Sequence, residues 1–128
     1  MSGSRYRWLV FRAWIELVRY DVLQALPGRR GIQLPAASPR AIPTADGGLE
    51  RTICTAVVLA CCFYWKPVLC LQRSTCAVRL LRAHGVPARL VIGYRPLPFF
   101  SHAWVEVEGR VVNDSPVYQQ RLQILHTA

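Results

Sequence analysis

Hydrophobic and polar positions repeat with a helical period in the first part of the chain. Residues 5–26 contain no proline or glycine. At about 100° per residue, four charged residues fall on one narrow stripe: Arg5, Arg12, Glu16 and Arg19. Large apolar residues cover most of the remaining circumference: Trp8, Phe11, Trp14, Ile15, Val18, Val22 and Leu23. We therefore expect one helix that is buried on more than one side. A docking surface for a second protein and an interfacial membrane helix are the alternatives.

The composition changes sharply after this helix. Residues 27–48 hold four prolines and four glycines, which predicts a loop or linker. We therefore divide the chain into residues 1–48, an N-terminal apolar helix with a Pro/Gly-rich linker, and residues 49–128, a domain that carries the chemistry.

Residues 49–128 show helical patterns first and strand patterns afterwards. The helices are expected at 49–65 and 70–84, the second ended by Gly85 in a left-handed cap. Strand-like runs follow at 88–95, 102–114 and 119–125, and Glu108-Gly109 marks a tight turn inside the second run. Helices followed by an antiparallel meander indicate an α+β architecture.

Charge and cysteine content limit the possible partners and the compartment. The net charge is +9, but the fifteen arginines and one lysine are spread along the chain, which does not favour nucleic-acid binding and suits an acidic partner. Five cysteines with no secretory signal indicate free thiols in the cytoplasm. No transmembrane span is expected, because no stretch offers about 18 uncharged apolar residues.

A cysteine, a histidine and an aspartate stand where they can act together. Cys70 opens a predicted helix, where unpaired N–H groups and the helix dipole favour a thiolate and can hold an oxyanion. His102 begins a strand and Asp114 ends the next one, so pairing about the intervening turn brings both to one edge of the sheet. A carboxylate-held imidazole facing a thiol is the arrangement of an activated nucleophile.

The motifs around these residues resemble one family. Four runs within about residues 50–118 carry the resemblance: C-L-x-R-S, L-L-R-x-x-G-x-P-A-R-L-x-I-G, H-A-W-V-E-V and N-D. They are similar to the motifs of the transglutaminase-like leader peptidases of lasso peptide biosynthesis, in their short stand-alone form. The resemblance implies a papain/transglutaminase-like core, with a nucleophile-bearing helix packed on a small antiparallel sheet. It also implies a Cys70, His102 and Asp114 protease triad.

The same resemblance implies a function and partners. The expected activity is removal of the leader from a ribosomally made precursor peptide, with a separate leader-recognition protein. The ATP-dependent lasso cyclase would act afterwards, so no metal or organic cofactor is expected in this chain. A non-catalytic module that only binds a peptide or partner is the alternative, and a transamidase is a closer rival.

Four further residues are candidates for supporting roles. Trp65 can serve as an oxyanion donor, with packing in the core as its alternative. Arg73 can position the first helical turn or bind substrate, and Trp104 can wall the substrate cleft or pack in the sheet. Asn113 can orient His102 in place of Asp114, but the resemblance favours Asp114 for this role.

Overall fold

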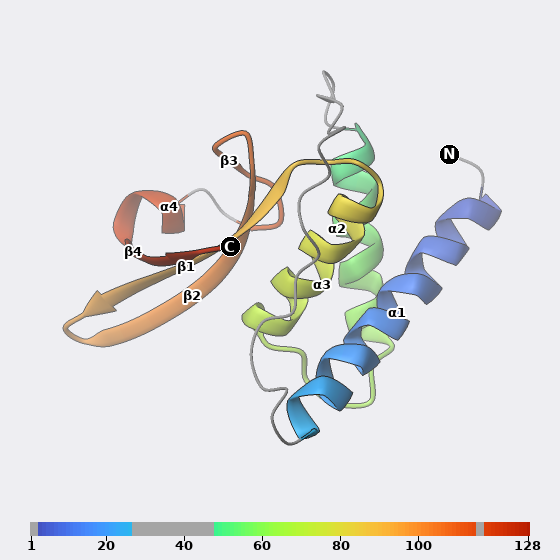
Figure 1. Cartoon of the computed structure of the whole chain (residues 1–128), viewed down its shortest axis with the longest axis horizontal. Helices are drawn as coiled ribbons and strands as arrows, with labels where there is room; N and C mark the ends of the chain where they lie inside the picture. Colours follow the sequence, from blue (N-terminus) through green and yellow to red (C-terminus); the bar gives the residue numbers. More distant parts are fainter. Residues whose placement is uncertain (1–2, 27–47, 115–116) are drawn as a thin grey trace.

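The computed structural model describes residues 3–26, 48–114 and 117–128. Three helices form one layer and a four-stranded antiparallel sheet forms the other (Figure 1). In chain order the elements are α1 (Gly3–Ala25), α2 (Gly48–Cys62), α3 (Cys70–Ala83), β1 (Ala88–Pro96), β2 (Phe99–Val107), β3 (Arg110–Val111), α4 (Val117–Arg121) and β4 (Gln123–Thr127). The α+β prediction, with its N-terminal helix and small antiparallel sheet, is confirmed.

The turns predicted from glycine are present. Glu108 and Gly109 both have positive φ, 52° and 79°, as a tight hairpin between β2 and β3 requires. Gly85, with φ of 81°, ends α3, and the N–H of Val86 donates to the carbonyl of Leu81 at 2.9 Å. These contacts form the glycine-dependent cap that stops a helix before an extended segment.

The last part of the chain departs from the expected meander. The strand order is β3-β2-β1-β4, so the final strand pairs with β1 rather than following β3. The strand predicted at 119–125 is wrong in its first half, where α4 stands instead. Since β3 and β4 lie at opposite edges, the chain must cross the sheet, and α4 carries it over the face turned away from the three long helices (Figure 1).

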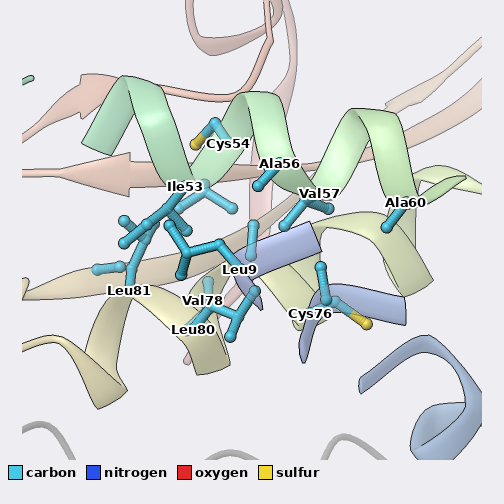
Figure 2. Close-up of a cluster of buried hydrophobic side chains, with 14 of the residues drawn as sticks. Leu9, Ile53, Cys54, Ala56, Val57, Ala60, Cys76, Val78, Leu80 and Leu81 are labelled. Carbon is cyan, nitrogen blue, oxygen red and sulfur yellow. The ribbon is translucent and has the colours of Figure 1, made fainter. Parts of the chain in front are cut away.

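Helix α3 lies at the centre of the hydrophobic core. Its Val78, Leu80 and Leu81 are buried against Ile53 and Val57 of α2 (Figure 2). Burying a Val, Leu or Ile side chain contributes roughly 1.5–3 kcal/mol. The helix that carries Cys70 is therefore held along most of its length by apolar packing.

The prediction that the first helix, α1, is buried on more than one side is wrong. Leu9, Ala13 and Leu17 are buried in the shared core, and so is Glu16, which was expected on the polar stripe. The Glu16 carboxylate accepts from Nε of Arg79 at 2.6 Å, and this ion pair lets a charged residue face α3. Helix α1 packs through one side only.

The outer face of α1 is consequently apolar and exposed. The exposed fractions are 53% for Trp8, 61% for Phe11, 41% for Ile15 and 52% for Val22. The linker predicted at 27–48 lies outside the described residues apart from Gly48. Within the described ranges, no helix is long and apolar enough to cross a membrane.

Candidate active site

Cys70 is the first residue of α3 and its side chain is half-buried. The preceding residue, Leu69, is extended, with φ of −84° and ψ of 167°, and offers no polar side chain to cap the helix. The first amide groups of a helix lack partners within the helix and carry partial positive charge. A thiolate, or an oxyanion formed beside it, would therefore meet favourable N–H groups here.

His102 and Asp114 contact each other directly, as their predicted positions across the hairpin suggested. Nε2 of His102 donates to Oδ2 of Asp114 at 2.6 Å, because the carboxylate can only accept. This bond leaves Nδ1 as the ring nitrogen that can exchange a proton with a thiol. Both side chains are largely buried, so the contact is shielded from solvent.

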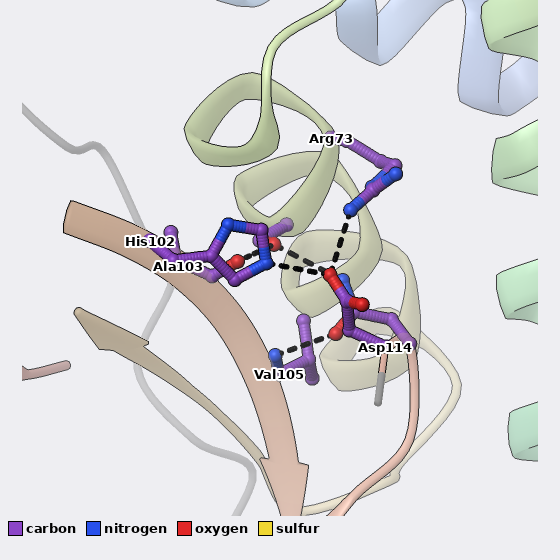
Figure 3. A network of polar contacts seen from close by, with 7 residues as sticks. Arg73, His102, Ala103, Val105 and Asp114 are labelled. Carbon is purple, nitrogen blue, oxygen red and sulfur yellow. Dashed lines mark hydrogen bonds and ion pairs between the residues drawn. The ribbon is translucent and has the colours of Figure 1, made fainter. Parts of the chain in front are cut away.

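Arg73 of α3 contacts the same carboxylate oxygen. Its Nη2 donates to Oδ2 of Asp114 at 3.0 Å, and Figure 3 shows the Arg73 and His102 side chains converging on Asp114 from different elements. Arg73 follows Cys70 by about one helical turn, so the two residues share a side of α3. The ion pair therefore ties the end of α3 that carries Cys70 to the Asp114–His102 pair.

The Asn113 side chain is hydrogen-bonded to Val105 and Ser74, whereas Nε2 of His102 donates to Asp114. Oδ1 of Asn113 accepts from the N–H of Val105 at 2.8 Å, and its Nδ2 donates to Oγ of Ser74 at 3.0 Å (Figure 3). Ser74 in turn donates to the carbonyl of Ala103 at 3.2 Å. Ser74 also lies one turn after Cys70, so these bonds join the Cys70 side of α3 to the strand that carries His102.

The edge position of His102 follows from the shortness of β3. Among the residues that the structure describes, β3 pairs with Glu106 and Val107 alone, so β2 has no strand partner on that side at His102. The segment after β3 is thus available to place Asp114 beside the imidazole. Beyond β3, the N–H of Val112 donates to the carbonyl of Val105 at 3.0 Å, and the Asn113 side chain accepts from the N–H of Val105, so one backbone bond and one side-chain bond extend this edge.

Aromatic rings hold the imidazole of His102 on its other sides. The ring of Tyr118, from α4, lies 4.1 Å from that of His102 between centroids, and Phe100 lies at 6.2 Å. Tyr118 was not among the predicted site residues, because it directly precedes the strand expected at 119–125 and belongs to no chemical motif. Helix α4, which stands where a strand was expected, therefore contributes an aromatic side chain to the site.

The degree of burial of the two tryptophans excludes one of the two alternatives expected for each. Trp104 is fully buried and its indole N–H donates to Glu106 at 2.8 Å, so it packs in the sheet and does not wall a cleft. Its ring lies against Gly93 of β1, where an added Cβ would come within 2.6 Å of it. Trp65 is 73% exposed, so the core-packing interpretation is wrong, whereas the oxyanion role stays a prediction.

The chain was compared with known proteins. The model of the transglutaminase-like superfamily matches residues 10–127. Microcin J25-processing protein McjB of Escherichia coli is 45% identical over 56 residues, which are 44% of this chain and 27% of McjB. The match therefore spans about a quarter of the length of that relative. No solved structure matches.

The remaining cysteines differ in exposure. Cys54 and Cys76 are buried, whereas Cys61 is half-buried and Cys62 is exposed. Burial raises the pKa of Cys54 to about 11. Burial also raises the pKa values of Cys76 and Cys61. Because the thiolate is the reactive form, the buried thiols are poor nucleophiles at neutral pH.

We predict that iodoacetamide at neutral pH alkylates Cys62 and Cys70 at least about tenfold faster than Cys54 and Cys76 in the folded protein. Peptide mapping by mass spectrometry measures each site separately. Labelling in denaturant, where the burial is removed, serves as the control and should bring the five rates together. Equal rates in the folded protein would contradict the burial described here.

Proposed function

The chain belongs to the transglutaminase-like superfamily, and we propose that it is a cysteine peptidase that removes the leader from a lasso peptide precursor. The Asp114–His102 pair, tied through Arg73 to the helix that Cys70 opens, is the observation that carries this proposal. The similarity to McjB, a microcin J25-processing protein, supports a processing role.

In the proposed reaction, Cys70 is the nucleophile and His102 the general base. Nδ1 of His102 takes the thiol proton, and the sulfur attacks the carbonyl carbon of the last leader residue. The first N–H groups of α3 stabilise the oxyanion. His102 then gives its proton to the departing amine of the core peptide, which leaves the leader as a thioester on Cys70.

Water completes the cycle. His102 accepts a proton from a water molecule as the oxygen attacks the thioester. The Cys70 sulfur leaves and takes that proton from His102, so that the free leader acid and the native thiol form. Asp114 holds the imidazole through Nε2 and offsets its positive charge while the proton resides on Nδ1. Arg73 shares that carboxylate and keeps it aligned with α3.

We predict that Cys70→Ala lowers cleavage of the cognate precursor by at least about 10³-fold, because the covalent step is lost. Asp114→Asn should lower it by about 10²-fold or more, since the imidazolium loses its counter-charge. Mass spectrometry of the precursor, incubated with the protein and a leader-recognition protein, measures both changes.

Cys62→Ala is the matched control, because it removes an exposed thiol outside the site. It should leave cleavage unchanged. An intact precursor with every variant and with the native chain, despite demonstrated binding, would favour a peptide-binding module. Incorporation of an added amine in place of a free leader acid would favour a transamidase.

The outer face of α1 is the proposed docking site for the separate leader-recognition protein. Its exposed apolar row, Trp8, Phe11, Ile15 and Val22, runs beside Arg5, Arg12 and Arg19. The two acidic residues of this helix, Glu16 and Asp21, are both engaged within the chain. The face therefore suits an apolar partner surface with an acidic rim. The proposal also includes an ATP-dependent lasso cyclase that acts after leader removal. It places the protein in the cytoplasm, where the thiols stay reduced.

We predict that Phe11→Glu weakens binding of the recognition protein by about tenfold or more, because it places a charge in the centre of the apolar row. Ile124→Glu is the control, since Ile124 is similarly exposed but lies on β4. Calorimetric titration measures both affinities. Unchanged affinity for Phe11→Glu would place the partner elsewhere.

A further inference from the structure

One carboxylate of α1 gathers three side-chain donors from around the nucleophile. Asp21 accepts from the hydroxyl of Tyr64, from Nζ of Lys66 at 2.6 Å and from Nε2 of Gln72 at 3.1 Å. Nε2 of Gln72 also donates to the carbonyl of Leu17 at 3.0 Å. These contacts join α1 to the loop before α3 and to the first turn of α3.

The donors lie on both sides of Cys70 in the sequence. Tyr64 and Lys66 precede the nucleophile, and Gln72, which is buried, follows it within the first turn of α3. A group that holds both ends of so short a segment restricts the position of the residue between them. From this geometry we infer that Asp21 is a positioning residue for Cys70, an inference that rests on the proposed function.

The charge states at neutral pH fit this role. Burial alone would raise the pKa of Asp21, but the hydrogen bonds from Lys66, Tyr64 and Gln72 outweigh it and lower the pKa below its ordinary value. Burial and the bond to Asp21 raise the pKa of Tyr64 to about 12. Asp21 is therefore ionised and Tyr64 is a donor, so the contacts persist until acid protonates the carboxylate.

A second carboxylate of α1, that of Glu16, serves as a control for a purely structural role of Asp21. Glu16 is buried and, like Asp21, joins α1 to α3, through Nε of Arg79 at 2.6 Å. Arg79 lies more than two helical turns after Cys70, whereas Gln72 lies in the first turn with it. Removing either carboxylate should destabilise the fold, but only the loss of Asp21 should displace the nucleophile.

The test compares Asp21→Asn with Glu16→Gln in the full chain with its recognition protein. Both variants should lower the melting temperature. Asp21→Asn should lower kcat for precursor cleavage by about tenfold or more with little change in KM, because small displacements of reacting groups are costly. It should also change the rate of Cys70 alkylation. Glu16→Gln should keep kcat and that rate within about twofold of the native values.

Tyr64→Phe removes one donor, keeps the carboxylate, and should give an intermediate loss of kcat. It also carries the test if Asp21→Asn does not fold. If the loss of kcat is proportional to the decrease in melting temperature in all variants, including Glu16→Gln, the inference is overturned. Cys70 alkylation is read without cleavage, so it separates the two proposals. If the native chain cleaves nothing, the proposed function fails, while a selective effect of Asp21→Asn on Cys70 would still support positioning.

Discussion

A single carboxylate oxygen, Oδ2 of Asp114, accepts from both His102 and Arg73, and the site depends on this shared acceptor. It joins the edge of the sheet to the first turns of α3, where Cys70 lies. The apolar core fixes the helix against the sheet along its length, while the polar contacts set its alignment at one end. Without Asp114, the imidazole of His102 and the guanidinium of Arg73 would lose the carboxylate that both contact. Neither side chain would then be held in its position.

Helix α1 also helps to fix the position of α3, from the side opposite to the sheet. Its inner face supplies apolar packing and two carboxylates: Glu16 pairs with Arg79 of α3, and Asp21 accepts from Lys66 before α3 and from Gln72 in its first turn. Its outer face keeps an apolar row beside arginines. The proposed partner would therefore dock on the same helix that holds the segment around Cys70 through Asp21.

The features that could be predicted from the sequence are those encoded locally. The helical and strand periods, the Gly85 cap and the Glu108-Gly109 turn each depend on neighbouring residues, and the hairpin then brought His102 to Asp114. The failures involve long-range contacts. The burial of Glu16 requires Arg79, and Tyr118 reaches His102 only because α4 crosses the sheet. The two alternatives for Trp104 stayed open in the sequence, because its packing depends on Gly93 of another strand. No local pattern reports such contacts.

In the proposed reaction, Cys70 carries the leader as a thioester before water releases it. Rapid acid quenching of the native chain with its precursor and recognition protein, followed by peptide mapping, tests this directly. We predict a transient adduct with the mass of the leader acyl group on Cys70, replaced over time by the free leader acid. Cleavage without any adduct on Cys70, or with the adduct on another residue, would contradict the assignment of the nucleophile.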